Sequence, residues 1–344
     1  MRVVRLHAAR DLRIHDEPVP VPGPGEVLLR VRAVGVCGSD THYYAEGHIG
    51  ETWITEPHVL GHEFSAQVEQ VGAEVSNVKP GDPVAVEPGW SCGHCEWCEQ
   101  GHPNLCPHVR FCGTPPTDGA LREFMPWPAH LVFPLPAGVS FAEAAALEPL
   151  TVGIHSVNFL GKIKPGDTVA VLGSGPIGLT VIMLAKAAGA TQIITTDLID
   201  GRLSVAQHLG ATATINAQRD DPVAAIKELT GGRGVDVVFE AAGAVETPHQ
   251  AVQVARIGGL VVIIGIFREE MIALGSSIAR RRGLTIKFDR RTKHAMNRAV
   301  ELVQRGAVDL KPMLTHRFPL ERAAEAMEMV ERKGDGVIKA VVEV

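Results

Sequence analysis

The chain has 344 residues, of which 45% are hydrophobic and 21% charged, and its formal net charge is -6. This length predicts two domains, and the hydrophobic fraction excludes a disordered chain. The mild acidity argues against nucleic acid as a partner, and no signal peptide or unbroken apolar membrane span is evident, so we expect a cytoplasmic protein.

Two loops in the N-terminal part carry residue types that bind metals. A valine-rich strand expected over residues 26–36 leads to Cys37, and a second apolar stretch leads to His62 and Glu63. Thiolate, imidazole and carboxylate groups are the usual ligands of zinc, and three of them leave a position open for substrate or water. A single such residue is more often part of a core. The two loops together favour a catalytic zinc site.

Four further polar residues have candidate roles at this site. Glu148 lies among alanines and leucines, where binding to the metal or to its water would explain a carboxylate; an exposed glutamate at a helix end is the alternative. Ser39 and His42 suggest a relay that carries the proton of a substrate hydroxyl to solvent. Asp40 could hold a ligating histidine in one tautomer. Ser39 and Asp40 are also ordinary turn residues.

Four cysteines form a second candidate metal site. Cys92, Cys95 and Cys98 have the spacing C-x-x-C-x-x-C, and Cys106 follows eight residues later. Four thiolates make a closed tetrahedral zinc site, which is structural because no position is open for chemistry. Disulfides are the alternative in an oxidising compartment. A nucleic-acid-binding zinc ribbon is disfavoured by the few basic residues nearby.

From residue 151 the pattern changes to alternating strands and helices. Strands are expected at residues 168–172, 192–196, 213–216, 235–240, 260–266 and 284–288, with helices between most of them. This alternation predicts a doubly wound parallel sheet.

A glycine motif follows the first of these strands. Gly173, Gly175 and Gly178 have the spacing G-x-G-x-x-G, which allows a tight turn, close approach of a pyrophosphate and close packing of the next helix. Asp197, about twenty residues on, can accept both ribose hydroxyls of NAD and would repel the extra phosphate of NADP. Arg202 could bracket the adenosine, or be a solvated helix residue. A turn that binds nothing is the alternative for the whole motif.

Other positions are expected to contact the cofactor or the substrate. Ile177 lies in the glycine turn, and the end of the fifth strand adds Ile264, Gly265 and Ile266. A basic cluster then follows in DRRTKH, residues 289–294, and it includes Arg290 and Arg291. This cluster is interpreted either as a solvated helix start or as a contact to substrate or to the nicotinamide half of NAD.

Together these features resemble the zinc-dependent medium-chain dehydrogenases, and in particular their polyol (sorbitol, xylitol, L-iditol) dehydrogenase branch. The family resemblance rests on CGSD at 37–40, GHE at 61–63, the four-cysteine lobe and GSGPIG at 173–178. The branch is suggested by HYYAEGHIG at 42–50, CGTPPTDG at 112–119, ALEPL at 146–150 and THRFPL at 315–320. Alcohol dehydrogenases of the family usually have a cysteine in place of Glu148.

The resemblance implies a GroES-like β-barrel catalytic domain and a Rossmann NAD-binding domain, assembled into dimers or tetramers. The first is expected over 1–150 and 291–344, with a structural zinc lobe at about 89–107, and the second over 151–290. The implied ligands of the catalytic zinc are Cys37, His62, Glu63 and Glu148, the last bound directly or through water. Ser39 is the implied relay hydroxyl, Tyr43, Glu148 and Arg291 are implied substrate contacts, and Asp197 and Arg202 are implied ribose contacts.

The expected reaction is hydride transfer from a secondary hydroxyl of a polyol to NAD+, in a cleft between the domains, with zinc lowering the pKa of the hydroxyl. The alternatives are an L-threonine 3-dehydrogenase or a simple alcohol dehydrogenase, a zinc-free quinone or enoyl reductase, and an inactive nucleotide-binding protein. Polyol enzymes often carry an aromatic residue after Arg291, where this chain has Thr292 and then Lys293 and His294. A basic rim there would favour an acidic or phosphorylated polyol.

Overall fold

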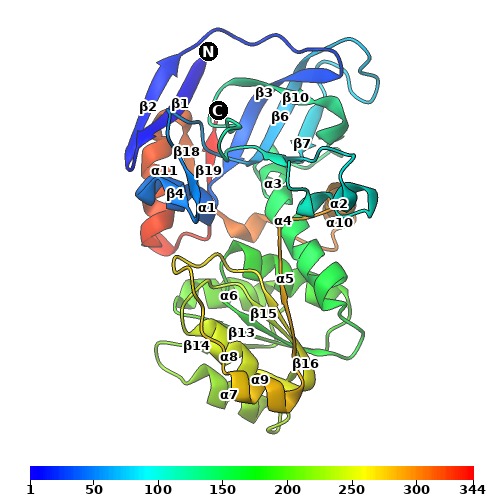
Figure 1. Cartoon of the computed structure of the whole chain (residues 1–344), viewed down its shortest axis with the longest axis vertical. Coiled ribbons are helices and arrows are strands. Elements are labelled where there is room, and N and C mark those ends of the chain that lie inside the picture. The colour runs from blue at the N-terminus through cyan, green and yellow to red at the C-terminus, as the bar shows by residue number, and fades with distance from the viewer. The chain divides into compact units, whose positions relative to one another are not determined.

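The computed structural model describes all 344 residues, which divide into two compact units. The first unit comprises Met1–Glu148, Lys293–Arg305 and Leu310–Val344, and the second comprises Pro149–Thr292 and Gly306–Asp309. Both ends of the chain therefore belong to the first unit (Figure 1). None of the helices combines the length and the apolar character needed to cross a membrane.

The first unit is built on a seven-stranded sheet. Its strands run in the order β11 (Val132–Pro134), β7 (Pro83–Val86), β6 (Glu63–Val71), β3 (Glu26–Gly35), β19 (Lys339–Glu343) and β18 (Leu314–Pro319), and β10 (Phe124–Pro128) also pairs with β3. The pairings are antiparallel except between β18 and β19. Because β19 pairs with β3, the C-terminal strand completes the N-terminal sheet.

Smaller elements surround this sheet. Three separate antiparallel pairs are β1 (Arg2–Ala8) with β2 (Asp11–Asp16), β4 (His48–Ile49) with β5 (Thr52–Trp53), and β8 (Gly89–Trp90) with β9 (Arg110–Phe111). The helices are α1 (Gly38–Glu46), α2 (Glu96–Glu99), α3 (Phe141–Ala145), α10 (Met296–Gln304) and α11 (Ala323–Arg332). Strand β3 is buried along most of its length because it has β6, β10 and β19 as neighbours and α3 packs on it. Its valines and leucines are buried, and the exposed Arg30 interrupts them.

The second unit contains the doubly wound sheet that the sequence predicts. Its strands run in the order β14 (Ala213–Asn216), β13 (Gln192–Asp197), β12 (Thr168–Leu172), β15 (Val235–Glu240), β16 (Ala255–Ile263) and β17 (Thr285–Phe288), and all pairs are parallel. The strand order reverses between β12 and β15. In such sheets the carboxyl ends of the strands at this reversal form the ligand-binding crevice.

The helices of the second unit form two groups. They are α5 (Pro176–Ala187) and α6 (Asp200–Leu209), which pack together, and α7 (Pro222–Leu229), α8 (Thr247–Val254) and α9 (Ser276–Arg282), which pack in series (Figure 1). Helix α4 (Leu147–Ile154) continues into a π-helix, η3 (His155–Gly161), which packs on α5 and β16.

One predicted boundary is wrong in a way that affects the candidate site. The fifth strand ends at Ile263 rather than at Ile266. After the bond from Ile264 N–H to the carbonyl of Glu240, the next N–H groups of the neighbouring strand, on Ala242 and Gly243, donate to the carboxylate of Glu240 instead of continuing the ladder. Helix α5, which follows the glycine motif, begins at Pro176, because proline is well suited to the first turn of a helix.

Candidate functional site

Cys37 lies where β3 passes into α1. It occupies the N-cap position of that helix, and its N–H donates to Oδ2 of Asp40 at 3.0 Å. The other carboxylate oxygen of Asp40 accepts from the N–H of Gly61 at 3.2 Å and lies 3.4 Å from Nδ1 of His62. Asp40 therefore joins the two loops that the sequence singled out. With Nδ1 of His62 held by Asp40, Nε2 is the nitrogen left for a metal.

Glu63 is paired with a lysine that sequence reasoning missed. Nζ of Lys339 lies 2.7 and 2.6 Å from the two carboxylate oxygens of Glu63 and donates to the carbonyl of Val36 at 3.1 Å. Both charged side chains are almost completely buried. Burial opposes a charge on Lys339, but Glu63 and Cys37 raise its pKa. The signal available in the sequence was a lysine within the apolar run VIKAVV.

The donor set fits a zinc ion. One ligand atom each from Cys37, His62 and Glu63 lies within 4.8 Å of the others. Burial opposes charge on His62, yet Asp40 and Cys37 raise the pKa of its imidazole well above the ordinary value. The cluster thus favours a positive charge at its centre, which a divalent cation bound through thiolate, imidazole and carboxylate would provide.

Four other predicted residues are not part of this ligand group. Glu148 is buried, which raises the pKa of its carboxyl to about 7, and it interacts electrostatically with His62 and Glu63. Tyr43 is buried in α1. Ser39 and His42, both half-buried, are three residues apart on α1 and so share one helix face.

The four cysteines of the lobe also converge. The sulfur atoms of Cys92, Cys95, Cys98 and Cys106 lie within 4.8 Å of one another, and none forms a disulfide. Backbone hydrogen bonding at His94 lowers the pKa of Cys92 to about 6, which favours its thiolate. Short loops held by this cluster suit a closed tetrahedral zinc site.

Lys293, from the predicted basic cluster, is bonded to this lobe. Its Nζ donates to the carbonyl of Gly101 at 3.1 Å and lies 2.8 Å from Nδ1 of His102. These contacts connect the lobe to the segment of chain that leads into α10.

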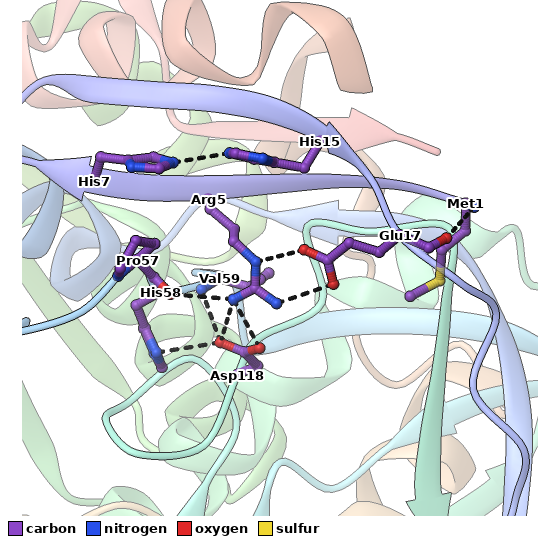
Figure 2. A network of polar contacts seen from close by, with 9 residues as sticks. All are labelled: Met1, Arg5, His7, His15, Glu17, Pro57, His58, Val59 and Asp118. Carbon is purple, nitrogen blue, oxygen red and sulfur yellow. Dashed lines mark hydrogen bonds and ion pairs between the residues drawn. The ribbon is translucent and has the colours of Figure 1, made fainter.

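A polar network holds the segment of chain that leads to His62 (Figure 2). Asp118 accepts from the N–H of Val59 at 3.0 Å and from the guanidinium of Arg5 at 3.1 Å, and it lies 3.3 Å from Nδ1 of His58. Arg5 in turn donates to Glu17 at 2.6 Å. One carboxylate thus holds the chain just before the metal-ligand motif. Asp118 lies in the loop CGTPPTDG, for which sequence analysis offered no role.

Replacement of Asp118 by asparagine should lower the free energy of unfolding by about 1–3 kcal/mol, because the charged acceptor for Arg5 and Val59 is lost. Urea unfolding would measure this. Asp16→Asn, at an exposed position on β2, should change the value by less than about 0.5 kcal/mol. Equal effects of the two variants would contradict a supporting role for Asp118.

The glycine turn has the geometry that its motif requires. Gly173 has φ +99°, and a Cβ there would meet the backbone of Ala242 at 2.8 Å. A Cβ on Gly178 would collide with the carbonyl oxygen of Gly173, whereas a Cβ on Gly175 would make only an ordinary contact with the guanidinium of Arg202. The first and third glycines therefore serve packing, and the second has no backbone close to it at the start of α5, where a phosphate would bind. Ile177 is half-buried in the same first turn.

Asp197 ends β13 beside this turn. Its carboxylate accepts from the N–H of Ser174 at 2.8 Å and from those of Leu198 and Ile199 at 2.8 and 3.0 Å. Arg202 lies near Gly175, with its guanidinium 3.8 Å from where a Cβ would be. Burial lowers the pKa of Arg202, while the charge of Asp197 opposes this.

Glu240 is a second residue that sequence reasoning missed. It is fully buried at the end of β15, and one carboxylate oxygen accepts from Ala242 N, Gly243 N and Thr247 Oγ1 at 2.9, 2.8 and 2.7 Å. Its backbone carbonyl accepts hydrogen bonds from the N–H groups of Ile264 and Gly265, in the loop after β16. Glu240 thereby joins the two loops at the carboxyl edge, and Gly243 and Gly265 come into contact there. Ile264 is half-buried in this loop and Ile266 is exposed.

The basic segment begins at a buried anchor. Asp289 lies 2.7 Å from Nδ1 of His155 and accepts from Ser156 Oγ. Arg290 is exposed, and Arg291 has a left-handed backbone, with φ +58°. Non-glycine residues held in this region occur preferentially at functional sites.

A thiol, imidazole and carboxylate cluster in one unit and a dinucleotide-type glycine turn in the other define the class as a zinc- and nucleotide-dependent oxidoreductase. Residues 23–137 match the family model "Alcohol dehydrogenase GroES-like domain", and residues 176–305 match "Zinc-binding dehydrogenase". The chain belongs to the zinc-binding dehydrogenases of the medium-chain dehydrogenase family, as the sequence predicted, and its GroES-like and Rossmann fold class is confirmed.

Relatives of known name are similar to this chain over nearly its whole length. Sorbitol dehydrogenase of Bacillus subtilis is 40% identical over 342 residues, covering 99% of this chain and 97% of that protein. Sorbitol dehydrogenase of Homo sapiens is 41% identical over 334 residues, covering 96% and 93%.

Solved structures agree as well. An Escherichia coli oxidoreductase of unknown specificity superposes with a TM-score of 0.95 at 34% identity, covering 99% of this chain and 98% of the other. A zinc-binding dehydrogenase of Sinorhizobium meliloti, bound to NADP, has a TM-score of 0.92 at 33% identity, covering 100% and 99%.

Proposed function

We propose that the protein is a zinc-dependent polyol dehydrogenase that oxidises a secondary hydroxyl to a ketone with NAD+. The observation that carries this proposal is the convergence of Cys37, His62 and Glu63. Sorbitol dehydrogenases that are 40% and 41% identical to this chain over nearly its whole length support a polyol as the substrate.

Residues of the first unit would hold the metal and move the substrate's proton. Cys37 and His62, with Glu63 and Glu148 beside them, would hold a zinc ion, which when bound supplies Lewis acidity that lowers the pKa of a substrate hydroxyl. Asp40 keeps the imidazole of His62 oriented. Ser39 Oγ and the imidazole of His42 would carry the released proton outward, and Nδ1 of His42 lies 3.8 Å from Glu46.

The second unit would hold the cofactor, whose nicotinamide ring accepts the hydride. Gly175 leaves room for the pyrophosphate at the N-terminus of α5, and Asp197 and Arg202 would contact the adenosine ribose. Tyr43 and Arg291 are proposed substrate contacts. Arg290 and the residues Ile177, Ile264, Gly265 and Ile266 are proposed cofactor contacts.

A substrate panel tests the function directly. NADH formation should be fastest with sorbitol, xylitol or a related polyol, and slower with simple alcohols and L-threonine. Because the ammonium of Lys293 is bonded to the cysteine lobe, a basic rim depends on Arg290, Arg291 and His294. Sorbitol 6-phosphate in the panel tests that rim, and L-threonine as the best substrate would overturn the polyol assignment.

Replacement of Asp197 by serine should raise KM for NAD+ by about 10- to 100-fold, because a charged acceptor for the ribose hydroxyls is lost. It should also reduce the enzyme's preference for NAD+ over NADP+. Initial rates with each coenzyme would measure this. Asp220→Ser, at an exposed position, should leave both values unchanged. An unaltered coenzyme ratio in Asp197→Ser would count against this role.

The family resemblance also leads us to propose a cytoplasmic homo-oligomer, a dimer or tetramer, whose mass light scattering of the purified protein would determine.

A further inference from the structure

Two histidines face each other on the ribbon formed by β1 and β2 (Figure 2). The Nε2 atoms of His7 and His15 lie 2.8 Å apart, and their rings are 5.0 Å apart between centroids with planes inclined by 21°. Both side chains are half-buried, so solvent reaches them. We propose that this pair binds one divalent transition-metal ion, at a site that shares no residue with either zinc cluster.

The spacing of the two nitrogens suits bidentate coordination. Imidazole nitrogens bind such ions at about 2.0–2.1 Å, so an ion equidistant from both would subtend about 86° at the present separation. This is near the right angle of square-planar or octahedral coordination, the geometries of Cu2+ and Ni2+. A tetrahedral zinc ion would need the nitrogens to move to about 3.4 Å apart. The ring centroids are 5.0 Å apart with the Nε2 atoms 2.8 Å apart, so the rings point almost directly at each other and each must also turn to aim its nitrogen at a shared ion. With that turn the pair favours Ni2+ or Cu2+, with water completing the coordination.

The proton balance also permits binding. In the metal-free pair one Nε2 donates a proton and the other accepts it. Binding through both Nε2 atoms moves that proton to Nδ1 of the same ring, so no other group has to change its charge.

The charges around the pair are balanced, so they do not oppose the binding of a cation. The carboxylates of Asp11 and Glu17 interact electrostatically with His7 and His15 respectively. Each is also paired with an arginine, Asp11 with Arg13 and Glu17 with Arg5, so the positive charges nearby are balanced. The competing reading is a hydrogen bond that only joins the two strands.

The test equilibrates the full chain, carrying its own zinc, with a small excess of NiCl2, removes free metal by gel filtration, and counts nickel and zinc per chain by mass spectrometry. We expect one nickel ion per chain and an unchanged zinc content. His15→Gln should retain at least about tenfold less nickel. His208→Gln, which removes an exposed histidine on α6, should retain as much as the unaltered chain.

His7→Gln provides an independent second variant, and circular dichroism of each variant checks that it is folded. Three results would overturn the proposal: no nickel retained by the unaltered chain, folded His7 and His15 variants that retain as much nickel as the unaltered chain, or nickel gained only as zinc is lost one for one. Because the readout is metal content rather than turnover, it does not depend on the substrate proposed above.

Discussion

Replacement of Cys37 by serine is expected to lower kcat/KM for polyol oxidation at least about a thousand-fold and to remove one of two zinc ions per chain. A serine hydroxyl is a poor zinc ligand, and losing the Lewis acid costs several kcal/mol of transition-state stabilisation, with about 1.4 kcal/mol for each tenfold loss. Steady-state kinetics and metal analysis of the same preparation measure both effects.

Cys98→Ser is the matched control, because it removes the same atom from the other cluster. It should also lose one zinc ion, but its main effect should be on stability, since the lobe has no open coordination position. If Cys37→Ser kept normal turnover after losing its zinc, the proposed mechanism would be wrong. If both variants lost activity equally and remained folded, the division into catalytic and structural sites would be wrong.

Replacement of Lys339 by methionine is expected to lower the free energy of unfolding of the metal-free chain by about 3–5 kcal/mol. Removing one partner of a buried ion pair leaves the other charge uncompensated, and here Glu63 would remain buried with Glu148 nearby. The pKa of Lys339 is raised in the folded chain, so the lysine's contribution is fully present at neutral pH and declines only as the pH rises through that raised value. Urea unfolding with a chelator present measures the effect.

Lys311→Met is the control, because the side chain of Lys311 is 70% exposed and its ammonium lies 3.9 Å from Glu143. Exposed pairs contribute about 0–1 kcal/mol, so this variant should be nearly as stable as the unaltered chain. Similar losses in both variants would show that the buried pair has no special role. With zinc bound, Lys339→Met should lose less stability, because the ion would neutralise part of the carboxylate charge.

Local patterns in the sequence were sufficient for the second unit. Short runs rich in β-branched residues predicted Thr168–Leu172, Ala213–Asn216 and Val235–Glu240 with their observed bounds. Strand ends were harder, as at Ile263, because the hydrogen bonds that stop a strand come from a neighbouring strand.

The sequence by itself determined which residue types lie together on one turn: the spaced cysteines, the glycine motif, and the loops bearing Cys37 and His62. Such spacings are properties of a few consecutive residues, so they can be read without a fold. Only the tertiary structure decided what neutralises Glu63, what supports the segment before His62, and which carboxylate joins the loops after β15 and β16. Glu63 and Lys339 are 276 residues apart, and they meet only because β19 pairs with β3, beside β6. A charge whose partner depends on strand pairing is invisible to local pattern, since the low-dielectric interior that makes the pair necessary exists only once the sheet is assembled.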